Sequence, residues 1–222
     1  MPAAADRSLT RTDPIGQRAA EVIRILRAAY PGATVALRFT NPLEILIATI
    51  LSAQCTDAKV NEVTATLFTK YRTPQDYLRV PEDELRADIK STGFYNQKTI
   101  SIRESCRRIV EVYGSQVPDT MEELQTLRGV ARKTANIVLA NGFGKVEGFP
   151  VDTHVKRLSN RIGFSAHTDP DKIEQDLLRL VPREEWSPFS YALIDHGRAI
   201  CQAKKPRCAE CPIEHLCPSS QA

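Results

Sequence analysis

The residues best suited to chemistry are four cysteines near the C-terminus, Cys201, Cys208, Cys211 and Cys217. Their spacing is Cys-x6-Cys-x2-Cys-x5-Cys, and thiolates this close together can ligate one metal centre. A structural zinc site usually has two short ligand pairs joined by a longer arm, whereas this segment has one short pair with a longer arm on each side. The spacing favours a [4Fe–4S] cluster, with zinc or a disulfide pair as alternatives.

A cationic loop overlaps the first arm of the cysteine segment. Arg198, Lys204, Lys205 and Arg207 lie between positions 198 and 207, and no acidic residue interrupts them. A basic loop held by a cluster is suited to contact the phosphates of a nucleic acid. Charge alone favours the alternative, which is an ordinary solvated loop.

A second candidate is the stretch Leu-Arg-Gly-Val-Ala-Arg-Lys-Thr-Ala at 127–135, which lies between two predicted helices. Gly129 permits a backbone conformation that other residues disfavour, so the stretch predicts a tight helix–hairpin–helix. The second helix is expected to begin near Arg132, and its free N–H groups would form an anion site for a DNA phosphate. An ordinary interhelical turn is an equally good interpretation of this segment alone.

Lys133 falls in the first turn of that second helix, where cations are usually disfavoured. Lysine is a nucleophile only as the neutral amine, and an ordinary pKa of about 10.4 leaves roughly 4 in 10,000 neutral at pH 7. A helix dipole supplies only about 0.3–1 kcal/mol of the roughly 4 kcal/mol required for a pKa near 7.5. Desolvation in a pocket would have to supply most of the free energy needed to lower the pKa. The alternative is a surface lysine that pairs with a phosphate.

Asp152 begins the segment Asp-Thr-His, at the expected start of another helix. In isolation it is best interpreted as an N-cap, but facing Lys133 it could accept the amine's proton or stabilise a positive charge on a sugar. His154 is more often a structural histidine than a catalyst.

The composition predicts a protein of the cytoplasm. The first eight residues lack the apolar core of a signal peptide, and the longest apolar run, 45–51, is too short to span a bilayer. A reducing cytosol lowers the odds of disulfides and raises those of a metal site. The formal net charge of +3 indicates little about partners by itself.

The elements that position these residues are predicted to be helices. Apolar residues at 19, 22, 23 and 26 mark one helical face, and 43–52 is apolar nearly all round, as expected for a central buried helix. Thr120 and Glu123 fit a capping box, Asp169 before Pro170 fits an N-cap, and Gly197 is expected to end a helix. The predicted helices are 18–29, 43–52, 60–71, 81–90, 96–113, 121–127, 132–143, 153–162, 170–180 and 188–196. The first dozen residues are predicted to be a flexible tail.

These elements together closely resemble the endonuclease III family, which are DNA repair glycosylases with AP-lyase activity in the helix–hairpin–helix superfamily. The resemblance covers about residues 18–218. Beyond the hairpin lysine and the cysteine loop, it rests on motifs at 51–54, 93–96, 132–136, 152–154 and 196–198. It strongly favours the [4Fe–4S] cluster over zinc or disulfides.

The resemblance implies an all-α fold of two helical domains flanking a DNA-binding cleft. A six-helix domain with the helix–hairpin–helix would span 35–146. Residues 1–34 would form a tail and a helix belonging to the second domain, and 147–222 would hold the cluster. It further implies a cytoplasmic, nucleoid-associated monomer whose partner is damaged double-stranded DNA, with no membrane.

The resemblance also implies the roles of individual residues. Lys133 would attack C1′ of a flipped-out nucleotide, expel the base as a Schiff base forms and cleave the strand by β-elimination, with Asp152 activating the lysine or stabilising the sugar. Substrates would be oxidised or ring-saturated pyrimidines such as thymine glycol. Gln54 would fill the gap left by the flipped base and Phe94 would wedge into the opposite strand. The other expected DNA contacts are Arg128, Gly129, Ala131, Arg132, His154, Lys204, Lys205 and Arg207.

Three positions depart from the family pattern. Phe94 replaces a common leucine, Arg128 a proline and Ala131 a glycine. If position 131 requires a positive φ, Ala131 would cost on the order of 1 kcal/mol, and Arg128 would compensate by adding a cation. Two other functions compete with the bifunctional enzyme: a monofunctional glycosylase, which Lys133 argues against, and a cluster-bearing DNA-binding module without activity. The departures also suit a specialised paralogue.

Overall fold

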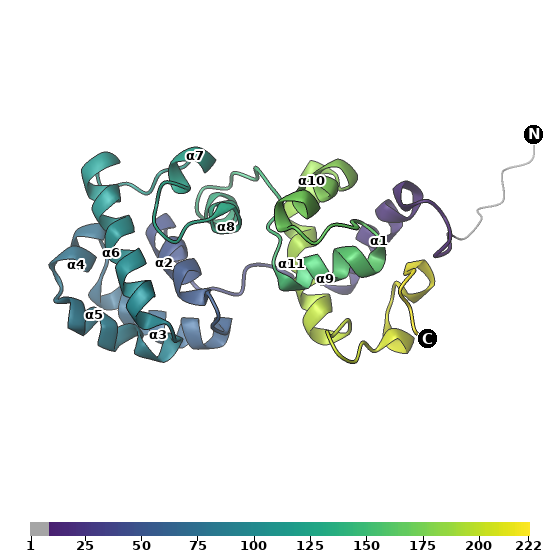
Figure 1. The fold of residues 1–222 in the computed structure, drawn as a ribbon, viewed down its shortest axis with the longest axis horizontal. Helices are drawn as coiled ribbons and strands as arrows, with labels where there is room; N and C mark the ends of the chain where they lie inside the picture. Colours follow the sequence, from purple (N-terminus) through teal and green to yellow (C-terminus); the bar gives the residue numbers. More distant parts are fainter. Residues whose placement is uncertain (1–8) are drawn as a thin grey trace, which may run out of the picture. The chain divides into compact units, whose positions relative to one another are not determined.

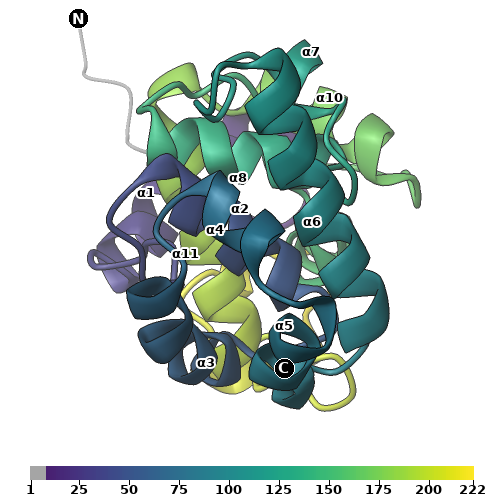
Figure 2. The ribbon, with the colours of Figure 1, turned by 90° about the vertical axis from the view of Figure 1, so that its left-hand side faces the viewer.

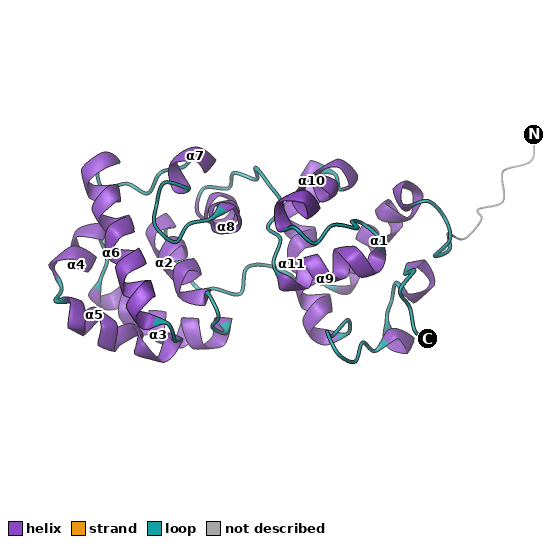
Figure 3. Cartoon of the chain, in the orientation of Figure 1, coloured by secondary structure: helices purple, strands orange, loops and turns teal. Residues whose placement is uncertain are grey.

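A computed structural model describes residues 9–222 of the chain. Residues 1–8, which include most of the expected tail, lie outside the described part. All regular structure in the described part is helical, as Figure 3 shows, and this confirms the predicted all-α class.

The chain divides into two compact units. One combines the residues up to Thr34 with Gly148–Ala222 and is called the terminal unit here. The other, Val35–Glu147, is called the central unit. Figure 1 shows the chain leaving the terminal unit after α1 (Ile15–Ala29) and returning to it before α9 (Thr153–Ile162).

The central unit is built around α2 (Pro42–Ser52), whose residues from 45 to 51 are all buried. Asn41 caps its start by accepting a hydrogen bond from the backbone N–H of Glu44, and Pro42 occupies the first turn. Helix α2 lies against α3, α6 and α8 (Figure 2). The other helices of this unit are α3 (Asp57–Lys70), α4 (Pro74–Arg79), α5 (Glu82–Ile89), η1 (Lys90–Thr92), α6 (Tyr95–Val112), α7 (Met121–Leu124) and α8 (Arg132–Gly142).

The terminal unit packs α11 (Trp186–Ala199) against both α1 and α9. Its core includes Leu26, Phe149 and Phe189, which are almost completely buried. Asp169 caps α10 (Pro170–Leu180) as predicted, since its carboxylate accepts hydrogen bonds from the next helical N–H groups. Short 3-10 turns η2 (Arg183–Glu185), η3 (Cys208–Glu210) and η4 (Glu214–Leu216) complete the unit.

Gly197 does not end a helix, contrary to the sequence-based prediction. Helix α11 continues through it to Ala199, and a Cβ at this position would lie 2.8 Å from Nδ1 of His154 and 3.0 Å from the guanidinium of Arg157. The glycine is therefore required for the close approach of α9 to α11, which is a tertiary reason that helix-stop rules do not include.

Helix α4 is absent from the sequence-based prediction. Its start carries a capping box, in which the Thr73 side chain accepts from the Asp76 N–H and the Asp76 carboxylate accepts from the Thr73 N–H. The six-residue helix is too short to show an apolar period, so only this cap could have revealed it.

Candidate active site and cluster site

The hairpin between α7 and α8 has the conformation that its glycine predicts. Gly129 has φ +81°, and α8 begins at Arg132 as expected. The backbone N–H of Val130 donates to the carbonyl of Leu127 at 3.2 Å, which closes the turn. The first N–H groups of α8 therefore follow directly after the turn, in the arrangement suited to an anion.

Ala131 is unstrained, so the suspected cost of replacing a glycine there is absent. Its φ is −87° and its ψ is 173°, which is extended backbone open to any residue. Ala131 is the N-cap of α8 and has no side-chain oxygen to accept a hydrogen bond from the helix N-terminus.

Helix α6 holds the hairpin in place. The hydroxyl of Ser105 donates to the carbonyl of Arg128 at 2.9 Å, and the guanidinium of Arg128 pairs with Glu104 at 2.9 Å. Arg128 was expected to add a free cation beside a phosphate, but in this structure its charge is already paired.

Lys133 lies in the first turn of α8 with its side chain exposed, while Arg132 is half-buried. The desolvation that a nucleophilic lysine requires is thus not supplied by burial of this side chain.

Asp152 is the N-cap of α9, and its Oδ1 accepts hydrogen bonds from the N–H groups of His154 and Val155, both at 2.8 Å. The capping interpretation is therefore correct for one oxygen. Among the described residues, the second oxygen, Oδ2, accepts no hydrogen bond and is available for another partner. Lys133 belongs to the central unit and Asp152 to the terminal unit.

His154 is a half-buried residue of the first turn of α9. Its Nδ1 lies 3.2 Å from the guanidinium of Arg157, and burial lowers its pKa from the ordinary value. A neutral ring in this position is suited to packing against Gly197.

Gln54 and Phe94 lie in two loops of the central unit and share an unusual backbone. Gln54 follows α2 with φ 52°, and Phe94 precedes α6 with φ 48°. Both side chains are exposed, and 62% of Phe94 is accessible to solvent, a high value for a large apolar residue. Non-glycine residues with positive φ concentrate at functional sites, so the structure adds a signal that the sequence does not contain.

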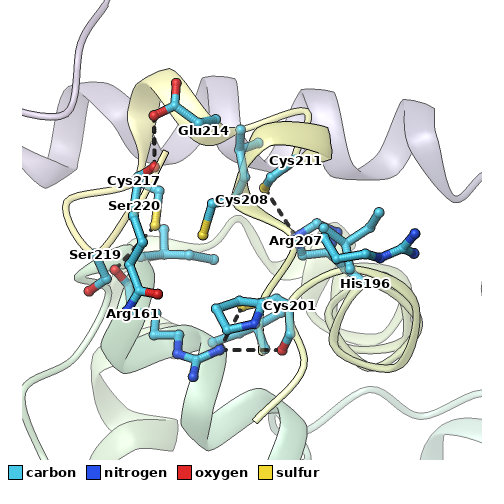
Figure 4. A pocket seen from close by; sticks show the side chains of 16 residues that line it. Arg161, His196, Cys201, Arg207, Cys208, Cys211, Glu214, Cys217, Ser219 and Ser220 are labelled. Carbon is cyan, nitrogen blue, oxygen red and sulfur yellow. Dashed lines mark hydrogen bonds between the residues drawn. The ribbon is translucent and has the colours of Figure 1, made fainter. Parts of the chain in front are cut away.

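The four C-terminal cysteines line one cavity of about 160 Å³ in the terminal unit. Figure 4 shows their sulfur atoms turned toward this common space. All six cysteines of the chain are free, so the disulfide alternative does not describe this structure. No three of the described His, Cys, Asp and Glu side chains are arranged to hold a single metal ion.

The donor set fits a multinuclear metal centre. Burial raises the pKa of the Cys211 thiol to about 11 and that of Cys217 in the same direction. A thiolate ligand has to be deprotonated, and a positive metal core among the sulfurs would offset the cost of burying that charge. The four sulfurs around one cavity therefore match a [4Fe–4S] cluster.

Two arginines of α9 that the sequence analysis missed hold the cysteine loop. Arg161 donates to the carbonyls of Gln202 and Ala203, both at 2.8 Å, and its Nη1 lies 3.3 Å from Sγ of Cys201 (Figure 4). Arg157 donates to the carbonyls of Gly197 and Cys201. Their spacing of four residues on one helix face is the only sequence signal, and it does not indicate an acceptor.

In the basic loop, two of the three residues expected to contact DNA have exposed side chains without an ion pair in the described part of the chain. Lys204 and Lys205 are exposed, and no ion pair of theirs occurs in the part of the chain that the structure describes. Arg207 instead pairs with Glu210 at 2.8 Å and donates to the carbonyl of Ala199 at 2.6 Å. Arg207 thus stabilises the loop itself.

Comparisons with known proteins agree with this site. Residues 47–183 match the model of the HhH-GPD superfamily of base excision DNA repair proteins, and residues 201–217 match the iron–sulfur binding domain of endonuclease III. The second match begins and ends on the outer two cysteines. A [4Fe–4S] cluster is therefore the cofactor of this protein.

Curated relatives are similar over nearly their whole length. Endonuclease III of Synechocystis sp. is 52% identical over 93% of this chain and 94% of its own. Endonuclease III of Escherichia coli K12 is 41% identical over 89% of this chain and 93% of its own. None of the described helices has the length and apolarity needed to cross a membrane.

Solved structures match in three dimensions as well. A non-covalent endonuclease III–DNA complex is 43% identical with a TM-score of 0.89, covering 93% of this chain and 96% of that one. A trapped endonuclease III–DNA covalent intermediate has the same identity and TM-score, covering 93% and 97%. The chain thus belongs to the endonuclease III family, the DNA glycosylase and AP-lyase enzymes of the HhH-GPD superfamily of base excision DNA repair proteins.

Proposed function

We propose that this enzyme removes oxidised or ring-saturated pyrimidines, of the thymine glycol type, from duplex DNA and then cleaves the strand through a lysine Schiff base. The observation that carries the proposal is the position of Lys133, an exposed amine in the first turn after the hairpin. A structurally similar endonuclease III has been trapped as a covalent DNA intermediate, and such an intermediate requires a nucleophile.

The covalent steps follow from amine chemistry. The neutral amine of Lys133 attacks C1′ of the damaged nucleotide, and the C1′–N bond to the base breaks as the base leaves with a proton. The sugar ring then opens as the C1′–O4′ bond breaks and O4′ takes up a proton, and the resulting iminium at C1′ makes the C2′ protons acidic. Loss of one of them expels the 3′ phosphate by β-elimination, and water then hydrolyses the Schiff base to release the lysine.

Because Lys133 is exposed in the free protein, we propose that the DNA itself supplies the desolvation. Closure of a flipped nucleotide over the side chain would exclude water and favour the neutral amine.

Asp152 would use its two oxygens for two tasks. Oδ1 is held by the N–H groups of α9, which fixes the position of the carboxylate. Oδ2 is left to accept the proton of the lysine amine or to stabilise the oxocarbenium-like sugar.

The remaining contacts would bind and open the duplex. The N–H groups after Gly129 and the ammonium groups of Lys204 and Lys205 would contact phosphates, and Gln54 and Phe94 would enter the base stack. The cluster ligands would be Cys201, Cys208, Cys211 and Cys217, and when bound the cluster would hold these four thiolates together and so organise the basic loop between the first two of them. We further propose that the enzyme acts as a monomer.

The test is incubation of the protein with a duplex that contains one thymine glycol, with and without borohydride. The expected result is a cleaved strand and, with borohydride, a trapped adduct, both lost in Lys133→Gln. Lys145→Gln is a matched control, because Lys145 is another exposed lysine of the central unit and pairs with Asp119. Base release without an adduct in the unmodified protein would indicate a water-dependent glycosylase, and binding alone would indicate a non-enzymatic module.

A further inference from the structure

A lysine that has no part in the proposed chemistry is almost completely buried. Lys98 lies at the end of the first turn of α6, with 4% of its surface accessible. Its Nζ donates to the carbonyls of Leu51 and Thr92, both at 2.8 Å. Burying an ammonium group is costly, and the two carbonyls offset part of that cost. Burial also lowers the pKa of Lys98 from its ordinary value.

The two carbonyls end two different helices. Leu51 lies in the last turn of α2, and Thr92 is the last residue of η1. Carbonyls at helix C-termini lack an intrahelical partner and carry partial negative charge, so a cation between them stabilises both ends. We call these two hydrogen bonds the Lys98 bridge. The bridge joins Leu51 and Thr92, which are 41 residues apart in the chain.

Each of these helix ends leads directly into a strained loop. Gln54, with φ 52°, follows Leu51 by three residues, and Phe94, with φ 48°, follows Thr92 by two. A left-handed backbone costs an ordinary residue about 1–2 kcal/mol and persists only where the surroundings hold it. The Lys98 bridge is a contact that holds the residues just before both loops at once.

We propose that Lys98 is a positioning residue that sets the separation of the Gln54 and Phe94 loops for insertion into damaged DNA. This inference rests on the proposed insertion of those two side chains. Two inserting groups act on the same opened step of the duplex, so an error in their separation would weaken extrusion of the nucleotide. Within the described residues the hydrogen bonds of the ammonium group go to backbone carbonyls, and in this proposal it does not touch DNA.

The chain provides a matched control on the same helix. Arg103, also on α6, donates to the carbonyls of Tyr77, Leu78 and Val80. It therefore performs the same kind of carbonyl binding at the C-terminal end of α4, which leads to neither Gln54 nor Phe94. Arg103→Met should lower stability without a specific effect on DNA opening.

The experiment compares Lys98→Met with Arg103→Met below the unfolding temperature of both, with Lys98→Gln as a milder variant should Lys98→Met fold poorly. The first readout is fluorescence of a 2-aminopurine placed beside a non-cleavable tetrahydrofuran abasic site in a duplex, which rises when the stack opens. The second is strand cleavage at an abasic site, measured in a duplex and in single-stranded DNA, where no stack has to be opened.

The Lys98 variants are expected to lose most of the fluorescence rise. Their duplex cleavage should slow by about tenfold or more, while single-strand cleavage stays within about twofold. Arg103→Met should preserve the ratio of the two rates. Equal slowing on both DNAs, or an unchanged fluorescence rise in a folded Lys98 variant, would show a purely structural lysine and overturn the proposal.

Failure of the proposed function gives a different pattern. If the unmodified protein opens the duplex and Lys98→Met does not, but neither cleaves thymine glycol DNA, the positioning role stands and the reaction is wrong. An unmodified protein that does not open the duplex at all overturns the role of Lys98 directly.

Discussion

Gly129 lies so close to Ser101 that a Cβ atom on the glycine would stand 3.1 Å from both Cβ and Oγ of the serine. The hairpin therefore packs directly on α6, and a side chain at position 129 would both crowd Ser101 and adopt a strained positive φ. The same helix binds the hairpin through Ser105 and Glu104 and, nearer its start, binds the loops of Gln54 and Phe94 through Lys98. Helix α6 is thus the common support of the expected DNA contacts in the central unit.

Gly129→Ala is expected to lower the free energy of unfolding by about 1–2 kcal/mol, because φ +81° is strained for alanine and the new methyl group crowds Ser101. Urea denaturation followed by circular dichroism would measure the change. Gly16→Ala is the control: Gly16 lies in α1, and a methyl group added there would have nothing within 4 Å, so alanine should be neutral or stabilise by up to about 1 kcal/mol. An equal effect at both positions would contradict the packing argument.

Asp152→Asn and Asp152→Ala should separate the capping role of Asp152 from its chemical role. Asparagine keeps an oxygen that accepts from the α9 N–H groups, so stability should change by only a few tenths of a kcal/mol, whereas alanine should cost about 1 kcal/mol. Both variants should lose base release on thymine glycol DNA, because neither carries a carboxylate. Thermal unfolding and single-turnover base release check the two parts, and an Asp152→Asn enzyme with full activity would leave Asp152 as a cap only.

The Lys204→Gln, Lys205→Gln double variant should reduce the dependence of DNA affinity on salt. Each phosphate neutralised contributes about 0.9 to the slope of log K against log salt, so the slope should fall by about 1.8 if both ammonium groups contact phosphates. Fluorescence anisotropy of an undamaged duplex over a range of salt concentrations measures it. Lys59→Gln, which removes a half-buried lysine paired with Glu62, should leave the slope unchanged.

Glu104→Gln should free Arg128 and strengthen DNA binding at low salt. The two groups are paired at 2.9 Å, and an exposed pair of this kind contributes only about 0–1 kcal/mol to stability, so the fold should be preserved. The salt slope should steepen by about 0.9 as Arg128 reaches a phosphate. An unchanged slope would mean that Arg128 does not contact DNA.

Removal of the cluster should release the loop at 201–217 while sparing the central unit. This segment is held by 3-10 turns, by a few arginine–carbonyl contacts and by Ile213 and Leu216, which are buried in the core of the terminal unit. The metal centre is expected to add further order through the four thiolates. Hydrogen exchange of the protein with and without its iron should show faster exchange in 201–217 and unchanged exchange in α2. Cys208→Ser should reproduce the effect and lose visible iron–thiolate absorption.

The sequence alone determined most of the helices and the cofactor. Helical periodicity and the caps at Thr120 and Asp169 are local signals, and ten of the predicted helices correspond to observed ones within a few residues at each end. The four-cysteine spacing and the hairpin glycine are also local, because ligation and a positive φ constrain neighbouring residues directly. Site roles such as those of Lys133 and Asp152 remain predictions from the family resemblance.

Tertiary structure decided what depends on residues far apart in the chain. Gly197 lies inside a helix where α9 passes close to it. The charge of Arg128 is paired with that of Glu104, and Ala131 is unstrained because the turn is completed before it. The Lys98 bridge and the Arg161 contacts are invisible in the sequence, since a buried cation that binds backbone carbonyls needs no particular partner residue. Backbone acceptors are present at every position, so only the folded chain determines which of them meet a donor.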